Sequence, residues 1–224
     1  MGLKDLFFPE ICPVCERLLV RGEKHICTEC LSDLPYSYFW NCAGNPAHSL
    51  LAEKIPVESV ATLMIYRKES NWKNILYDFK YSGDKSIGRY TSGILGKKMV
   101  QGGLFNDIEL IIPVPLHPLK KWIRGFNQAS VIAYELSKIM EVPVAENILK
   151  RGRYSISQTL KDRKGRSKGV SGAFYVKRGE NIDGKHVLLV DDVLTTGATA
   201  KECGMRLVEA YGVKLSFAAL AFVE

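Results

Sequence analysis

The sequence predicts an α/β fold in which a parallel sheet is flanked by helices and a small cysteine-rich module precedes it. Short apolar segments alternate with amphipathic segments from residue 57 onward, as expected for parallel strands joined by crossover helices. One apolar segment, residues 186–190, leads into two aspartates and a small-residue loop. Two Cys-x-x-Cys pairs within the first 30 residues indicate the separate module. We therefore expect a module over residues 1–50 and a main domain over residues 51–224.

The composition is that of a soluble globular protein with a sizeable core. Of the 224 residues, 46% are hydrophobic and 25% are charged, and both values are ordinary for such proteins. No apolar run approaches the roughly 18 to 20 residues that cross a bilayer, and the first residues lack a secretion signal. We therefore expect no membrane span and a cytoplasmic location, whereas the oligomeric state does not follow from the sequence.

The positive charge is concentrated in one segment. Residues 150–168 carry eight basic side chains and one acid, a net charge of +7 that equals the charge of the whole chain. Few apolar side chains lie in this segment, so we expect a surface loop. Such a loop can serve a pyrophosphate ligand, a nucleic acid or only solubility, and its composition does not decide among them.

Four cysteines in the N-terminal module have the spacing of a metal site; they are Cys12, Cys15, Cys27 and Cys30. Each pair can reach one ion, and four thiolates complete a tetrahedral site with no open position, which favours structural zinc. Disulfides or a redox pair are the alternatives, although a reducing cytosol disfavours disulfides. Cys42 and His48 form either a second, incomplete site or an ordinary loop.

The sequence of the first half of the main domain predicts two strands and two helices. Val57–Tyr66 is largely apolar and follows a proline, as expected for a buried strand. Ser70 can cap a helix that extends to Phe79, because large apolar residues recur in it at helical spacing. A second helix is expected from about Lys85 to Met99, and a short buried strand over Glu109–Ile112 ends in prolines.

The second half of the main domain alternates helices and strands in the same way. Its expected elements are a helix from residue 125 or 126 to 139, a strand over 142–144, an edge strand over 173–176, a strand over 186–190, a helix over 198–211 and a last strand over 213–222. Ligands bind at the carboxyl ends of the strands in such parallel sheets. The residues that follow strands 109–112 and 186–190 should therefore meet at one edge.

The segment after strand 186–190 has the chemistry of a ribose phosphate pocket. Backbone N–H groups and threonine hydroxyls of Thr195–Thr199, together with the following helix N-terminus, suit a phosphate. Asp191 and Asp192 would repel a phosphate. They can instead accept hydrogen bonds from sugar hydroxyls, directly or around a magnesium ion.

A second group of polar residues follows strand 109–112. Residues 113–117 form a proline-stiffened turn, and Lys120, Lys121 and Arg124 come after it. Cations and free backbone N–H groups at this position would suit a pyrophosphate group. The alternative is a proline-rich loop before a solvated basic helix.

The string VDDVLTTGAT, residues 190–199, resembles the phosphoribosyl pyrophosphate (PRPP) loop of the type I phosphoribosyltransferases. The resemblance implies that Asp191 and Asp192 meet the ribose 2′- and 3′-hydroxyls. It also implies that a five-residue loop holds the 5′-phosphate, namely Thr195, Thr196, Gly197, Ala198 and Thr199.

The order of motifs along the chain resembles the ComF family of competence-associated, phosphoribosyltransferase-like proteins. The motifs are the cysteine pairs, FKYxGD over residues 79–84, PVPLHP to RGFNQ over 113–128, an SxSQ segment over 155–166, GAF over 172–174 and the PRPP loop. Two departures are Gly169, where the family usually has Asn, and the absence of a full CxxCG after the first pairs. The first puts the chemistry of the basic loop in doubt, and the second argues against another full metal site.

Two functions from different classes remain open. As a phosphoribosyltransferase, the protein would bind magnesium-PRPP and release pyrophosphate on transfer to an unknown acceptor, in nucleotide metabolism or DNA uptake. Pyrophosphate would face Pro115, Leu116, His117, Lys120 and Arg124, and the basic loop would close as a lid. His117 is either an acid–base group or a loop residue. Alternatively, the protein is a non-catalytic PRPP sensor or a single-stranded-DNA adaptor that works with competence proteins.

Overall fold

The computed structural model describes residues 10–67, 69–152, 173–177 and 179–224. Most of the predicted basic loop, the SxSQ segment and the first residue of GAF lie outside these ranges. Of the helices in the described ranges, none combines the length and apolar character that crossing a membrane requires.

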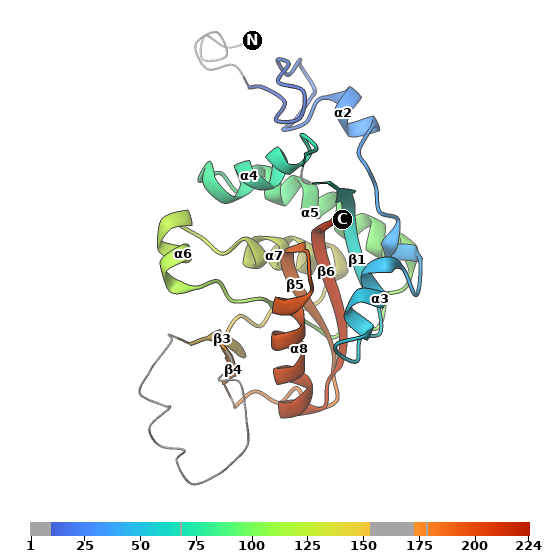
Figure 1. Cartoon of the computed structure of the whole chain (residues 1–224), viewed down its shortest axis with the longest axis vertical. Coiled ribbons are helices and arrows are strands. Elements are labelled where there is room, and N and C mark those ends of the chain that lie inside the picture. Colours follow the sequence, from blue (N-terminus) through green and yellow to red (C-terminus); the bar gives the residue numbers. More distant parts are fainter. Residues whose placement is uncertain (1–9, 68, 153–172, 178) are drawn as a thin grey trace.

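The centre of the molecule is a four-stranded parallel sheet with strand order β1-β6-β5-β2 (Figure 1). Its strands are β1 (Val60–Tyr66), β2 (Leu110–Pro113), β5 (His186–Leu194) and β6 (Lys214–Val223). All three pairings are parallel, so the carboxyl ends of the strands meet at one edge. This arrangement confirms the predicted parallel sheet.

Helices cover both faces of the sheet, because side chains alternate along each buried strand. Leu188 and Val190 belong to the core under one set of helices, whereas Val187 and Leu189 belong to the core under the other. The first set is α4 (Lys73–Tyr81), α5 (Ser86–Gly102) and α7 (Gln128–Met140), and the second is α3 (Pro46–Ala52) and α8 (Ala198–Tyr211). Helices α4, α5, α7 and α8 were predicted, and the bounds of α8 agree with the expected ones, whereas α3 was not predicted.

Strand β5 continues past the residue at which we expected it to end. It includes both aspartates, because β6 pairs with it from His186 to Leu194, with Asp191 opposite Ala219. Charged residues have low strand propensity, and here the neighbouring strand overrides that preference.

A short helix, α6 (Pro118–Arg124), takes the place of the expected start of the next helix. Gly125 ends α6 in the left-handed region, with φ of 77°, and Asn127 caps α7 by accepting a hydrogen bond from the Ala129 N–H. The expected start at residue 125 or 126 was therefore wrong, since that position is the break between two helices.

Two short strands form a separate antiparallel sheet, β3 (Leu149–Arg151) with β4 (Phe174–Val176). The expected edge strand over residues 173–176 thus pairs away from the main sheet. Residues 142–144 contribute a single bridge, Val144 to Ile111, instead of a strand.

The N-terminal segment comprises α2 (Thr28–Ser32), the 3₁₀ helix η1 (Phe39–Asn41) and α3. Cys12, Ile26 and Cys27 share the core beneath α4, and the Asn74 side chain donates to the Pro13 carbonyl at 3.0 Å. Figure 1 shows the cysteine-bearing segment lying next to α4. A domain boundary at residue 50 stays a prediction.

Candidate functional site

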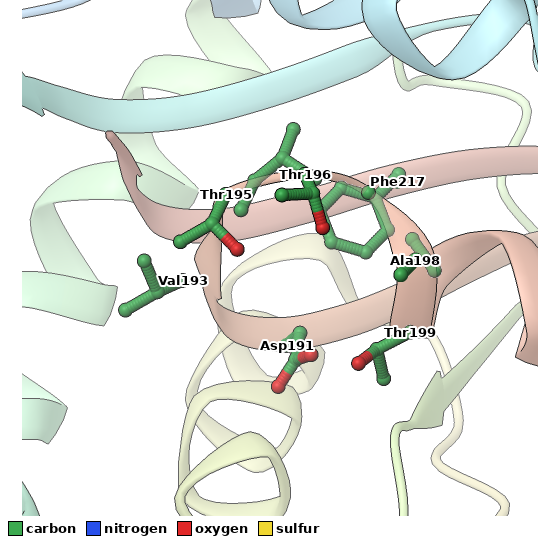
Figure 2. A pocket seen from close by; sticks show the side chains of 10 residues that line it. Asp191, Val193, Thr195, Thr196, Ala198, Thr199 and Phe217 are labelled. Atoms are coloured by element: carbon green, nitrogen blue, oxygen red, sulfur yellow. The ribbon is translucent and has the colours of Figure 1, made fainter. Parts of the chain in front are cut away.

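The loop of residues 195–199 links β5 to α8 and encloses a small cavity of about 40 Å³ (Figure 2). Asp191, residues 193–200 and Phe217 line this cavity. Among the described residues, no side chain caps the N-terminus of α8, which leaves the first backbone N–H groups of the helix for a ligand. The five residues predicted to hold a phosphate therefore surround one cavity.

Gly197 shapes this loop in two ways. Its φ is 72°, which is costly for residues with a side chain. A Cβ at this position would lie 2.7 Å from Leu51 Cδ2, so α3 supports the loop from behind. The sharp turn thus needs a glycine for conformation and for space.

A second cavity of about 180 Å³ adjoins the first and shares Asp191 and Thr199 with it. Side chains from separate parts of the chain line it: Lys80, Val114, Pro115, Leu116, Lys120, Arg124, Asn127, Gln128, Ala129, Arg151, Asp191, Asp192 and Thr199. The aspartates near the carboxyl end of β5 and the basic residues after β2 therefore meet at the carboxyl edge of the sheet, as the strand order predicts.

The charges around this cavity favour an anionic ligand with a polar, uncharged part. Four basic side chains and two aspartates line it. Burial, and then the charge of Asp192, raise the pKa of Asp191 well above its usual range. Lys80 Nζ lies 3.0 Å from Asp192 Oδ2 and pairs with it. Lys120, Arg124 and Arg151 form no ion pair with any described residue, so they can meet an anion.

The turn and helix on the basic side are held by specific hydrogen bonds. Asn127 Nδ2 donates to the Val114 carbonyl at 3.0 Å, which ties the turn to the start of α7. Arg124 donates to Gln128 Oε1 at 3.1 Å and lies 5.2 Å from the Tyr81 ring centre. These contacts fix the guanidinium at the rim of the cavity.

His117 has a structural role in this arrangement. Its Nδ1 accepts a hydrogen bond from the Leu119 N–H at 3.2 Å and so caps α6. Among the described residues that line the larger cavity, Pro115, Leu116, Lys120 and Arg124 are present but His117 is not.

Four polar or charged lining residues were not singled out as site residues from the sequence: Lys80, Asn127, Gln128 and Arg151. The first three lie within the FKYxGD and RGFNQ motifs, so the signal was present although no role followed from it. Arg151 belongs to the basic segment that we expected to serve a pyrophosphate or to close as a lid, but nothing distinguished it from the other basic residues of that segment. Its guanidinium stacks 4.9 Å from the Phe174 ring centre, across the β3–β4 pair.

The four cysteines form a compact group at the other end of the molecule. Their sulfur atoms all lie within 4.8 Å of one another, and the Sγ atoms of Cys15 and Cys27 are 3.6 Å apart. Tetrahedral zinc with bonds of about 2.3 Å requires sulfur separations of roughly 3.8 Å. The group therefore fits a metal such as zinc, and all six described cysteines are free of disulfides.

The other candidate metal ligands are ordinary residues. Cys42 is exposed, and His48 Nε2 lies 3.1 Å from the Val57 carbonyl. Within the described ranges, the four-cysteine group is the one set of three or more His, Cys, Asp or Glu side chains whose ligand atoms lie close enough to share a metal ion. Cys203 lies on α8 and is buried in the core.

The chain is similar to a domain model and to several curated sequences, including the following three. A model of the phosphoribosyl transferase domain matches residues 126–223. Competence protein F of Haemophilus influenzae is 37% identical over 107 residues, which are 47% of this chain and 46% of that protein. DNA utilization protein YhgH of Escherichia coli K12 is 25% identical over 88% of this chain and 84% of that protein. Competence protein ComFC of Bacillus subtilis is 25% identical over 65% and 57%, respectively.

The chain thus spans about half the length of the Haemophilus protein and most of the length of YhgH. Among solved structures, adenine phosphoribosyltransferase from Leishmania tarentolae is 14% identical with a TM-score of 0.38, over 63% of this chain and 73% of that one. The enzyme from Leishmania donovani is also 14% identical, with a TM-score of 0.39, over 65% and 68%. Similarity at this level carries no information about a ligand.

Proposed function

The chain belongs to the ComF family of type I phosphoribosyltransferase-like proteins, and we propose that it binds magnesium-PRPP. We further propose that it transfers the phosphoribosyl group to an acceptor with release of pyrophosphate. The acceptor is open, and a competence or DNA-uptake role rests on the names of the relatives.

One observation carries this proposal: the phosphate-sized loop cavity and the cation-lined cavity join at Asp191 and Thr199. PRPP has the same order of groups, a 5′-phosphate, a ribose and a pyrophosphate. Residues 195–199 would hold the 5′-phosphate, and Asp191 and Asp192 would accept hydrogen bonds from the ribose.

The donor set also fits magnesium, since carboxylate oxygens are ligands that this ion prefers. Asp191 and Asp192 would hold it, and the ion would neutralise part of the ligand's charge when bound. The raised pKa of Asp191 supports this fit. It reflects burial first and then repulsion between the two adjacent carboxylates in the free protein, and a bound cation would reduce that repulsion.

The protein's own contribution to transfer would be positioning and charge stabilisation. Lys120 and Arg124, with the turn at Pro115 and Leu116, would stabilise charge on the departing pyrophosphate. His117 would fix the start of α6 as its cap, which leaves no acid–base role for it in this proposal.

Calorimetric titration of magnesium-PRPP tests the binding step. Wild-type protein should bind, and the Asp191→Ala, Asp192→Ala double variant should lose at least about tenfold in affinity, since two hydrogen-bonding carboxylates are removed. Asp183→Asn is the matched control, because that aspartate is exposed and outside both cavities. Equal affinity of the double variant and the wild type would refute the assignment.

A pyrophosphate-release screen over nucleobases, amines and DNA fragments then tests turnover.

A second candidate function, binding of single-stranded DNA, is favoured by the surface of α6. The Trp122 side chain is 82% exposed and lies next to Lys120 and Lys121 in the sequence. Bases stack on such aromatic side chains while lysines follow the phosphates. Affinity for an oligonucleotide should fall with rising salt, and Trp122→Ala should weaken it by about 1 to 3 kcal/mol.

A further inference from the structure

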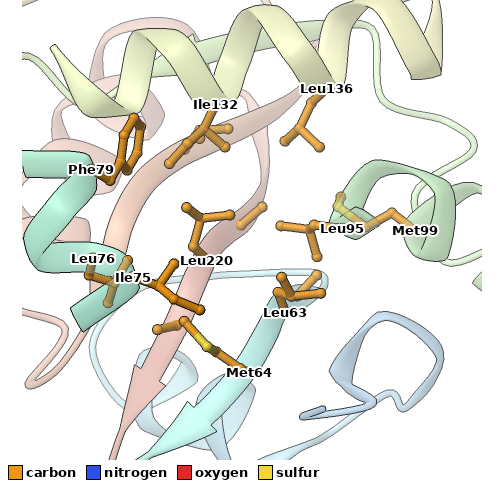
Figure 3. Close-up of a cluster of buried hydrophobic side chains, with 14 of the residues drawn as sticks. Leu63, Met64, Ile75, Leu76, Phe79, Leu95, Met99, Ile132, Leu136 and Leu220 are labelled. Atoms are coloured by element: carbon orange, nitrogen blue, oxygen red, sulfur yellow. The ribbon is translucent and has the colours of Figure 1, made fainter. Parts of the chain in front are cut away.

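Lys80 occupies a position between the two halves of the site. It lies near the C-terminal end of α4, and its side chain lines the larger cavity. Figure 3 shows why α4 holds it there: Ile75, Leu76 and Phe79 of this helix point into the core cluster. The core thus fixes the backbone of Lys80, while its ammonium reaches the cavity.

In the free protein this ammonium is bound to Asp192. The two charged atoms are 3.0 Å apart, and the Lys80 and Asp192 side chains are 22% and 16% exposed. Charges buried to this extent need a partner, because water no longer solvates them fully. Lys80 therefore pairs with the Asp192 carboxylate, to which ribose hydroxyls would donate hydrogen bonds in the proposed function.

We propose that Lys80 is a ligand-exchange residue, whose ammonium leaves Asp192 and binds a pyrophosphate oxygen when PRPP enters the cavity. This inference rests on the proposed function. Ribose hydroxyls can satisfy Asp192 by donating hydrogen bonds, but they bring no charge to pair with Lys80. The pyrophosphate supplies that charge, and the flexible four-carbon stem of lysine allows its ammonium to move within the cavity.

Ligands that carry different parts of PRPP test the exchange. Lys80→Met should weaken magnesium-PRPP and magnesium pyrophosphate at least about tenfold, because a charge-assisted hydrogen bond is lost. The same variant should bind ribose 5-phosphate as tightly as wild type or more tightly, because Asp192 no longer has a competing partner. Calorimetry measures all three affinities, with Lys73→Met as the control, an exposed lysine on the same helix.

The outcomes separate this inference from the proposed function. Wild-type protein that binds none of the three ligands would refute both. Wild-type binding of PRPP with unchanged affinity in Lys80→Met would refute the role of Lys80 alone. Equal weakening of ribose 5-phosphate and pyrophosphate would also refute it, since Lys80 would then merely hold Asp192 in place. If Lys80→Met does not fold, Lys80→Arg provides the test, and it should keep pyrophosphate affinity closer to wild type than Lys80→Gln.

Discussion

At the scale of single residues, Asp191 combines a proposed binding role with a cost in stability. Its carboxylate lies beside Asp192 in a half-buried position, and burial raises its pKa above the ordinary value. A carboxyl group whose pKa is higher in the folded than in the unfolded protein stabilises the folded state below the unfolded pKa of about 3.9. That contribution is lost as pH rises through the raised value.

We predict that Asp191→Asn makes the ligand-free protein more stable than wild type at pH values above the folded pKa of Asp191. The gain should increase as pH rises from the unfolded pKa of Asp191 to its folded pKa, since only the wild type must ionise a buried group. Urea unfolding at a series of pH values measures the difference. A constant difference across the window would contradict the assigned pKa direction, and Asp183→Asn should show no pH-dependent gain.

Gly197 supports a second residue-scale prediction. Gly197→Ala should lower the free energy of unfolding by about 1 to 3 kcal/mol, because alanine is strained at positive φ and its Cβ meets Leu51. Gly93→Ala is the control, since that glycine lies within α5 with open space around it and the change should be neutral or stabilising. Equal denaturation midpoints for Gly197→Ala and wild type would argue against this account of the loop.

At the scale of elements, the sequence predicted the helix ends that depend on neighbouring residues in the chain. Helix α8 begins and ends where expected, since a glycine precedes it and another follows it. The end of β5 depends instead on its pairing with β6. The pairing of β4 with β3 joins residues far apart in the sequence, so the hydrophobic pattern does not predict it. In the candidate site, residues 195–199 form one contiguous string, and their place beside Asp191 was predictable. Lys80 joins it through tertiary contact, which a motif alone does not reveal.

Asn127 caps α7 and also holds the turn at Val114, so substitutions there can separate an effect on stability from an effect on binding. Asn127→Ala should reduce stability by about 0.5 to 2 kcal/mol, because α7 loses its cap. Asn127→Asp keeps a capping oxygen but cannot donate to the Val114 carbonyl. We therefore expect the aspartate variant to retain more stability than the alanine variant while both bind magnesium-PRPP more weakly. Chemical denaturation and calorimetry measure the two effects, and identical stability of both variants would contradict the capping role.

At the scale of the whole molecule, the cysteine group and the ligand site are linked through α4. Cys12 and Cys27 share a core with Ile75 and Phe79 of that helix, and Lys80 follows directly in the sequence. Metal binding to four thiolates stabilises the segment that carries them. Loss of the metal should therefore loosen the support of α4 as well as the N-terminal segment.

We predict one zinc ion per chain by elemental analysis, and a lower unfolding midpoint after chelation. A decrease of at least about 5 °C is expected, which corresponds to roughly 2 kcal/mol for a protein of this size. Affinity for magnesium-PRPP should fall in parallel, because Lys80 loses its fixed position. Cys27→Ser should reproduce both effects, whereas Cys42→Ser, at an exposed cysteine outside the group, should reproduce neither. Chelated protein that keeps its PRPP affinity while its midpoint falls would show that the metal supports only the N-terminal segment, and that α4 is held by the rest of the core.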